Sequence, residues 1–412
     1  MLSATVIVIV LLGAKLLAQL WLDRINEKEV RKHAGAVPPA FVGTIDGPTY
    51  AKAVEYTLAK SRFGRKQLVF DAVILGAVLL SGVLPGLYDF FVNRFGGDMV
   101  SDAAYLFTVG VLLSLPSMPW DWVEQFRLEE RFGFNTSDQK TWWMDRVKGL
   151  VLSLILGFPL LLLILWLIPL TGAWWWLWAW ALVFGFQLLM VVLAPIIILP
   201  LFNKFTPLPE GALRDRLLRL GERTGFHSKT IQVMDGSKRS RHSNAFFTGF
   251  GSFRKIVLFD TLINQLSEVE LEAVLAHEIG HYKKKHILKM LAGSALGLLF
   301  AFFVIGLLAN QPWLYEPFGF KQGSIVPALL LFSLLSGTVT FWFTPLFNLL
   351  SRKFEYEADA YAAETMSEPS SLIGALRKLN EKNLSNLTPH PLYSGFYYSH
   401  PTLIERERAL KK

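Results

Sequence analysis

Two histidines four residues apart, the first followed directly by a glutamate, are the residues of this chain best suited to bind a catalytic metal ion. They stand in the order HExxH, as His277, Glu278 and His281. On an α-helix, residues four apart share one face, so both imidazoles can bind one tetrahedral zinc ion. Glu278 lies beside them and could take a proton from water that the ion activates, then pass it to a leaving amine. Two unrelated surface histidines are the alternative.

A catalytic zinc site of this kind needs one more protein ligand. The chain has no cysteine, so the ligand must be His, Asp or Glu, and His286 follows His281 too closely. Glu355 and Asp359 are again four residues apart on a helical stretch. We expect Glu355 to complete a His-His-Glu site and Asp359 to accept a hydrogen bond from a ligand imidazole. Alone, this pair fits a solvated helix face equally well, and Glu357 is the nearest competitor.

The elements that position these residues belong to a membrane protein. Hydrophobic residues make up 52% of the 412-residue chain, which is too apolar for an ordinary soluble enzyme. Seven stretches are long and apolar enough to span a bilayer, namely residues 2–21, 67–88, 103–118, 149–170, 174–201, 287–309 and 324–350. The predicted fold is therefore mainly α, a polytopic membrane protein with about seven transmembrane helices.

Loop charges predict how these spans are oriented. Lys and Arg crowd the loop after the first span and the loop before the fourth, and they are scarce in the loops after the second and sixth. Because basic loops stay in the cytoplasm, we expect the N-terminus outside and the metal site on the cytoplasmic side. The same loops explain the net charge of +8. No basic stretch has the aromatic spacing of a nucleic-acid reader, so the expected partners are membrane lipid and substrate, not nucleic acid.

The largest polar insertion is predicted to be a small cytoplasmic α+β domain. It has a helix pattern at residues 213–224 and strand patterns at 230–234, 244–249 and 255–259, followed by the HExxH helix. We expect a turn at 250–253, an edge strand able to pair with an extended peptide, and a loop-rich tail at 367–412 that wraps back. The predicted division is a transmembrane region at 1–202, a metal-binding core at 203–286, two spans at 287–350 and a segment with the third ligand at 351–412.

The order HExxH, two spans and then ExxxD resembles the integral-membrane zinc metalloproteases of the type I CAAX prenyl protease family. The similarity extends to residues 129–135, 240–250 and 398–406, and so over nearly the whole chain. It implies a gluzincin-like domain with one Zn²⁺ ion per chain. The implied zinc ligands are His277, His281 and Glu355, with the catalytic residues Glu278 as general base and Asp359 as a supporting or proton-handling acid.

The resemblance implies roles for three more residues. Asn244 would bind the substrate backbone, and His400 would be a catalytic residue that stabilises the oxyanion. Arg406 would anchor its own segment or the carboxylates near the metal, and we group it with the residues that bind substrate. From the residues alone, a histidine before Pro401 is more often structural. A water-filled chamber between the spans is implied as well.

We therefore predict an integral-membrane zinc metalloendopeptidase that cleaves membrane-associated or prenylated CAAX-type substrates. An HtpX-like quality-control protease is the main alternative, although such relatives are shorter. A transporter or scaffold with a structural zinc site is a weaker one, since the spans hold few ionisable residues and only three ligands are evident. The absence of cysteine leads us to expect a bacterial inner-membrane protein.

Overall fold

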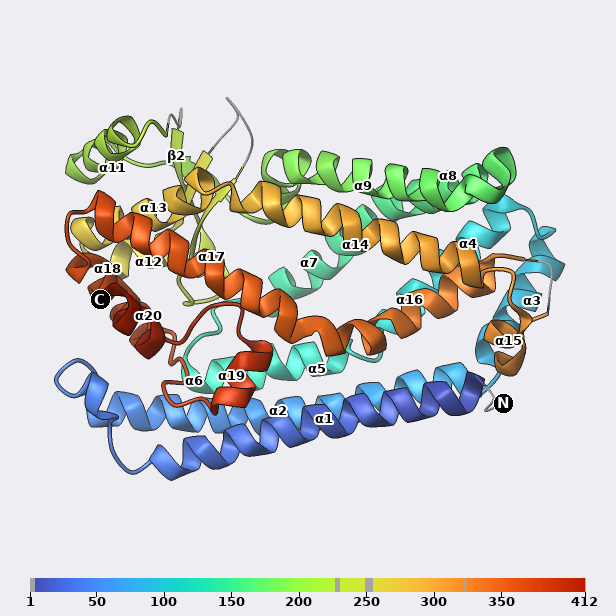
Figure 1. Cartoon of the computed structure of the whole chain (residues 1–412), viewed down its shortest axis with the longest axis horizontal. Helices are drawn as coiled ribbons and strands as arrows, with labels where there is room; N and C mark the ends of the chain where they lie inside the picture. Colours follow the sequence, from blue (N-terminus) through green and yellow to red (C-terminus); the bar gives the residue numbers. More distant parts are fainter. Residues whose placement is uncertain (1–3, 227–229, 249–254, 322–323, 412) are drawn as a thin grey trace.

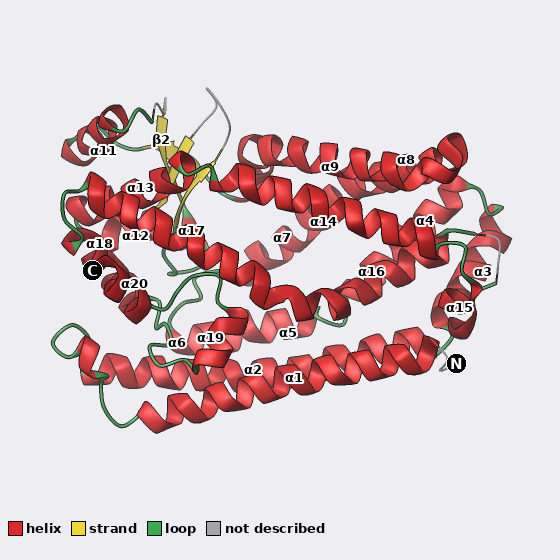
Figure 2. Ribbon diagram, in the orientation of Figure 1, coloured by secondary structure: helices red, strands yellow, loops and turns green. Residues whose placement is uncertain are grey.

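The structure is a computed structural model that describes residues 4–226, 230–248, 255–321 and 324–411. It is mainly helical, as predicted, and its strands are confined to one end of the molecule (Figure 2). The helices before the sheet are α1 (Ala4–His33), α2 (Gly47–Leu80), α3 (Val83–Phe95), α4 (Met99–Ser114), α5 (Met118–Val123), α6 (Glu130–Phe132), α7 (Gln139–Leu152), α8 (Phe158–Thr171), α9 (Trp175–Leu193) and α10 (Leu199–Phe202). The later helices are α11 (Ala212–Arg223), α12 (Asp260–Gln265), α13 (Glu268–Lys283), α14 (His286–Leu308), α15 (Pro312–Tyr315), α16 (Val326–Thr340), α17 (Thr344–Thr365), α18 (Ser370–Lys382), α19 (Pro391–Tyr397) and α20 (Leu403–Leu410).

Long apolar helices occupy most of the molecule. Within the described residues, five stretches are long and apolar enough to cross a membrane, namely Ala4–His33, Met99–Phe132, Gln139–Phe202, His286–Leu308 and Val326–Thr365. A sixth is the pair α2 and α3, which bends by 52° at its break. The stretch Gln139–Phe202 folds back on itself, because α8 packs against α9. Each of the seven predicted spans therefore overlaps one of these stretches. The number of membrane-spanning helices, predicted as seven, is approximate because one stretch folds back and one pair is bent.

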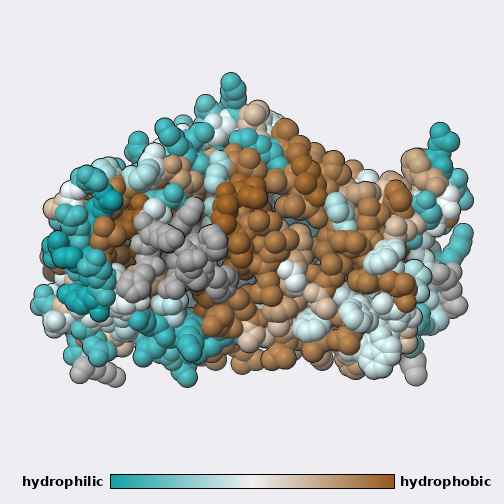
Figure 3. Space-filling view, turned by 90° about the horizontal axis from the view of Figure 1, so that it is seen from above, coloured by the Kyte–Doolittle hydropathy of each residue, from teal (hydrophilic) through white to brown (hydrophobic). Residues whose placement is uncertain are grey.

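The sharp return between α8 and α9 occurs at Gly172, where φ is +54°. Residues with a side chain rarely adopt this conformation, so glycine is the suitable residue here. Figure 3 shows a broad apolar surface over the middle of the molecule and hydrophilic residues gathered at the end that holds the sheet. The chain thus has the surface of an integral membrane protein with a polar domain at one end.

The sheet has four strands in the order β1-β2-β4-β3. They are β1 (Phe205–Pro207), β2 (Thr230–Met234), β3 (Ala245–Thr248) and β4 (Lys255–Phe259). β2 and β4 are parallel, and the two outer pairs are antiparallel. The three predicted strands are confirmed, whereas β1 was not predicted because three residues ending in proline carry no alternating pattern. The expected turn at 250–253 lies outside the described residues.

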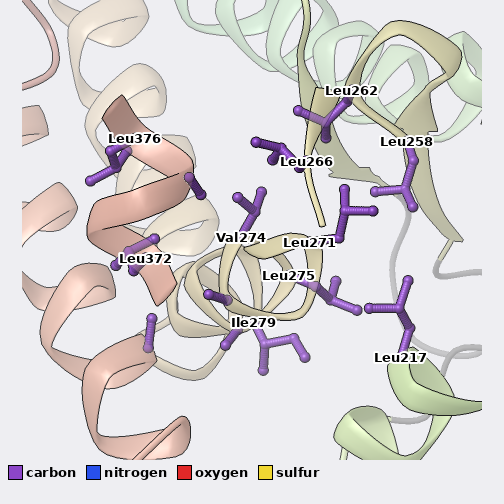
Figure 4. Packing of buried hydrophobic residues seen from close by; sticks show 14 of the residues in the cluster. Leu217, Leu258, Leu262, Leu266, Leu271, Val274, Leu275, Ile279, Leu372 and Leu376 are labelled. Atoms are coloured by element: carbon purple, nitrogen blue, oxygen red, sulfur yellow. The ribbon is translucent and has the colours of Figure 1, made fainter. Parts of the chain in front are cut away.

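Helix α13 lies at the centre of the polar domain. Figure 4 shows its side chains Leu271, Leu275 and Ile279 packed between two walls of leucines. One wall comes from α18, and the other from α11, α12 and β4. Each of these three side chains is about 1% exposed, so removing water from them stabilises the helix in one orientation. The opposite face of α13 is left to point its polar residues toward α17, with which it packs.

The C-terminal tail differs from the prediction. It wraps back on the domain as expected, but most of it is helical: α18 packs on α13, and α19 and α20 pack on α17 (Figure 1). The expected loop-rich character is therefore wrong. Its polar residues initiate and cap short helices, as Thr402 does for α20 through a capping box with Glu405. The predicted boundary at 350/351 also falls inside α17, which continues from membrane to polar domain without a break.

Candidate metal centre

Helix α13 carries the HExxH residues and begins at a well-defined cap. The Ser267 side chain accepts a hydrogen bond from the backbone of Glu270, and the Glu270 carboxylate accepts one from the backbone of Ser267. The predicted helix is confirmed. His277 and His281 lie one turn apart, and their Nε2 atoms are 3.2 Å from each other.

Glu355 of α17 meets both histidines. Its Oε2 lies 3.5 Å from Nε2 of His277, and its Oε1 lies 3.3 Å from Nε2 of His281. Two ligand atoms that bind one tetrahedral zinc ion at about 2.0–2.2 Å are about 3.3–3.6 Å apart. The two distances to Glu355 belong to its two different oxygens, and one ligand atom from each of the three residues lies within 4.8 Å of the other two. The three residues are therefore close enough to share one metal ion. Glu357, the competing carboxylate, lies outside this group and contacts His286 instead.

One oxygen of Glu355 lacks a hydrogen-bond partner. Oε2 is buried, and no donor among the described residues forms a hydrogen bond with it. Leaving a buried carboxylate oxygen unsatisfied costs about 1–3 kcal/mol or more. A cation between Glu355 and the two histidines would remove that cost. Two imidazoles and one carboxylate are also a donor set of catalytic zinc sites, which leave a fourth position open. The residues present therefore fit a zinc ion.

A second carboxylate of α17 and an arginine of α20 support the group. Oδ1 of Asp359 lies 2.9 Å from Nδ1 of His277, so the ring donates from Nδ1 to the carboxylate and turns Nε2 toward His281 and Glu355. Arg406 donates from Nε to Oδ2 of Asp359 at 2.7 Å, and its Nη1 lies 3.8 Å from Oε2 of Glu355. Arg406 is only 9% exposed. Arg406 thus contacts the carboxylates near the expected metal site, which is one of the roles expected for it.

The charges of these side chains depend strongly on burial. Burial raises the pKa of the Glu278 carboxyl, and the nearby histidines only partly oppose the effect. Burial also disfavours the charged form of His277, but the nearby carboxylates of Asp359 and Glu355 outweigh that effect and raise its pKa to about 9. Without a cation, the positive charge of protonated His277 therefore offsets part of the negative charge of Glu355 and Asp359. Glu278 is left as the carboxyl group with the highest affinity for a proton, as a general base requires.

A cavity of about 860 Å³ opens beside the group. His400 and Arg406 line one part of it, and residues of α1, α2, α18 and α19 and of the turn after α18, most of them polar, line much of the rest. The His400 side chain is 63% exposed to this cavity, and its Nε2 lies 3.4 Å from Oε1 of Glu355. Although one side of the ring is open to water, the protein around its other side disfavours the charged form and lowers the pKa of His400, so the ring is mainly neutral at pH 7. His400, which is expected to stabilise the oxyanion, thus lies beside the expected metal ligand Glu355.

Asn244 lies directly before β3, one of the two outer strands of the sheet. Its carbonyl accepts a hydrogen bond from Phe259 N at 3.2 Å, and its side-chain oxygen accepts one from Ala245 N at 2.8 Å. β3 also contacts α13. An edge strand therefore runs beside the helix that carries the histidines, as expected from the sequence.

Two residues that support Asn244 were missed in the sequence. His242 stacks on Phe134 with ring centroids 4.0 Å apart, and its Nε2 lies 3.2 Å from Oε2 of Glu129. Ser240 forms a β-bridge with Asn135. Residues 129–135 thus hold the segment that leads to Asn244. Both segments were noted as motifs, but no sequence signal places two motifs a hundred residues apart side by side.

Comparison with known proteins agrees with this arrangement. The family model described as "CAAX prenyl protease N-terminal, five membrane helices" matches residues 26–204, and that of peptidase family M48 matches residues 207–412. CAAX prenyl protease 1 of Saccharomyces cerevisiae is 37% identical over 409 residues, which cover 91% of this chain and 88% of the yeast protein. The CAAX prenyl protease 1 homolog of Oryza sativa is 34% identical, with 93% of each chain covered.

The human CAAX prenyl protease 1 homolog is 30% identical, with 94% of this chain and 91% of the human protein covered. The crystal structure of S. mikatae Ste24p superposes with a TM-score of 0.91 at 33% identity and covers 98% of both chains. These relatives are eukaryotic and give no support to the expected bacterial source. The similarity spans the membrane helices and the polar domain alike. The chain therefore belongs to the CAAX prenyl protease family and is an integral-membrane metallopeptidase of that type.

Proposed function

We propose that His277, His281 and Glu355 bind one zinc ion per chain and that this centre hydrolyses peptide bonds of prenylated or other membrane-associated substrates. The observation that carries the proposal is the cluster itself, in which one ligand atom from each of the three residues lies within 4.8 Å of the other two. When bound, the ion supplies a Lewis acid that polarises the scissile carbonyl and makes water more acidic.

Glu278 is the general base in this proposal. It follows the ligand His277 on α13, and burial raises the pKa of its carboxyl toward the range in which a base can both take and return a proton. It would accept a proton from the attacking water and deliver it to the leaving amine. Asp359 holds His277 in the tautomer that presents Nε2 to the ion, and Arg406 holds Asp359.

His400 is proposed to stabilise the oxyanion. Ser399 Oγ lies 3.0 Å from Nδ1 of His400. When this hydroxyl donates to Nδ1, the neutral ring carries its proton on Nε2, the atom that faces Glu355 and the cavity. An N–H donor beside the scissile carbonyl stabilises the negative charge that develops on its oxygen.

The substrate would lie along β3. Asn244 and the outer edge of this strand offer backbone groups that an extended peptide can pair with, next to α13. The cavity beside His400 is lined mostly by polar side chains, so it suits peptide, while the apolar helices around it suit a lipid-modified end. The names of the relatives, CAAX prenyl protease 1, point to the same class of substrate.

Membrane orientation and domain division are also proposals. The N-terminus and the polar domain lie at opposite ends of the molecule (Figure 1), which agrees with an outside N-terminus and a cytoplasmic site. We propose that residues 203–286 and 351–412 form the catalytic unit, with the spans of 287–350 between them and the spans of 1–202 around the cavity.

The test is cleavage of a farnesylated CAAX-type peptide by purified, zinc-loaded protein in detergent. Glu278→Gln is the matched control, because it keeps every ligand and removes only the base. We expect cleavage by the wild type and zinc binding by both proteins. Turnover by Glu278→Gln, or a wild type that binds zinc and leaves the peptide intact, would contradict the proposal. Equal cleavage of the same peptide without farnesyl would favour a quality-control protease.

A further inference from the structure

A buried histidine that is not a ligand links His281 to a third carboxylate. His286 is 0% exposed, and its ring stacks on Phe354 at 4.2 Å between centroids. Both of its nitrogens have partners. Nδ1 lies 3.0 Å from Nδ1 of His281, and Nε2 lies 3.0 Å from Oε2 of Glu357.

The donor in each of these two hydrogen bonds follows from the chemistry of the groups. An ionised carboxylate only accepts hydrogen bonds, so Nε2 of His286 must donate to Glu357. A neutral imidazole with its proton on Nε2 can only accept at Nδ1. His281 must then carry its own proton on Nδ1, which leaves the lone pair of its Nε2 facing His277 and Glu355. That is the tautomer a metal ligand needs.

We propose that His286 and Glu357 are positioning residues that hold His281 in its metal-binding tautomer and orientation. The proposal rests on the proposed function, in that the cluster of His277, His281 and Glu355 binds zinc. It gives the second histidine of the site a support equivalent to the one Asp359 gives the first.

The geometry of α17 explains why the support for His281 needs a relay. Glu355 and Asp359 are four residues apart and share a face, whereas Glu357 lies between them and projects to the other side of the helix. His286 bridges this separation from the start of α14. The turn before it places Lys285 at φ +58°, a strained conformation for a residue with a side chain. This turn returns the chain so that His286 faces His281.

The alternative is a structural histidine with a surface ion pair. Glu357 is also near Lys289 and Lys353, at 3.8 and 4.0 Å. Those distances are longer than the 3.0 Å contact to His286, and both lysines are at least half exposed. Surface ion pairs of this kind contribute little. The two short contacts, both of 3.0 Å, are those from Glu357 to His286 and from His286 to His281.

Matched substitutions at His286 separate a relay from packing. His286→Phe keeps a ring to stack on Phe354 but has no acceptor for His281. His286→Asn loses the ring but places an amide oxygen near the position of Nδ1. We expect His286→Phe to weaken zinc binding by about 10- to 100-fold, the usual effect of removing such a partner. We expect His286→Asn to stay within a few-fold of the wild type.

Zinc dissociation constants would be measured on the full-length protein in detergent by competition with a chromophoric chelator. Glu357→Gln, which keeps an acceptor for His286, should bind more tightly than Glu357→Leu, and this pair decides the matter if His286→Phe does not fold. Equal affinities across both pairs, or weaker binding by His286→Asn than by His286→Phe, would overturn the relay. A wild type that binds no zinc would overturn the proposed function, and the relay with it.

Discussion

Gly280 of α13 lies so close to Ala358 of α17 that a side chain on Gly280 would collide with the neighbouring backbone. A Cβ atom built there would be 3.0 Å from both Cα and O of Ala358. α13 carries His277 and His281, and α17 carries Glu355. The missing side chain of Gly280 therefore allows the close approach of the two helices that carry the proposed ligands.

Gly280→Ala should consequently weaken both the packing and the metal site. Backbone atoms cannot swing aside as a side-chain tip would, so α13 and α17 must separate, at a cost of about 1–3 kcal/mol. We expect a lower melting temperature in detergent and a lower zinc content after dialysis. Gly293→Ala in α14 is the control, because a Cβ there meets nothing within 4 Å. Similar behaviour of the two variants would show that the close approach is unimportant.

Replacing the proposed third ligand tests the composition of the site. Glu355→Ala removes the carboxylate that meets both histidines, so we expect zinc content, measured by elemental analysis, to fall well below one per chain. Glu364→Ala is the control on the same helix, since Glu364 is exposed and distant in sequence from the ligands. Full zinc occupancy in Glu355→Ala would mean that a different residue completes the site.

Zinc binding should release a proton from His277. In the metal-free protein the pKa of His277 is about 9, raised by Asp359 and Glu355 against the effect of burial. Below pH 9 the ring is charged, and a cation must displace its proton before Nε2 can bind. The apparent zinc affinity should therefore rise with pH up to about 9 and level off above it.

Calorimetry in two buffers of different ionisation enthalpy measures this proton directly. We expect the release of about one proton per zinc ion at pH 7. Asp359→Asn should reduce the release, because the amide no longer stabilises the charged ring. An affinity independent of pH between 6.5 and 9 would contradict the assignment of this proton to His277.

Sequence patterns anticipated the cluster of His277, His281 and Glu355 because each pair of residues lies on one helix. The spacing of His277 and His281, and that of Glu355 and Asp359, specifies a shared face whatever the rest of the fold does. The strands at 230–234 and 255–259 and the apolar spans were predictable for the same local reason. The meeting of the two helices was inferred from chemistry, since two histidines alone leave a zinc site incomplete.

Contacts that depend on the path of the chain could not be inferred in this way. His286 was set aside because it follows His281 closely, yet the turn at Lys285 makes it the neighbour of that residue. The support of Asn244 by residues 129–135 joins segments from different parts of the chain. The close approach at Gly280 is likewise invisible until α17 is placed against α13.

His400 offers a test of catalysis that leaves the metal in place. Its Nε2 faces Glu355 Oε1 at 3.4 Å, and its side chain is largely exposed to the cavity, so removing it should disturb the ligands little. His400→Phe loses the proposed N–H donor to the oxyanion. We expect kcat on the farnesylated peptide to fall by about 10²- to 10³-fold, as for the loss of one such donor. KM and zinc content should stay near the wild-type values.

A substitution at the neighbouring Ser399 should give a smaller loss of kcat than His400→Phe. Ser399→Ala removes the hydroxyl that lies 3.0 Å from Nδ1 of His400, so the ring can hold its proton on either nitrogen. We expect a loss of a few-fold in kcat, because only part of the population then lacks the donor on Nε2. The protein around one side of the ring lowers the pKa of His400 by disfavouring its charged form, so its donor form is neutral and persists as the pH rises above 7. A loss of zinc that parallels the loss of activity in His400→Phe would instead make His400 a support of the metal site.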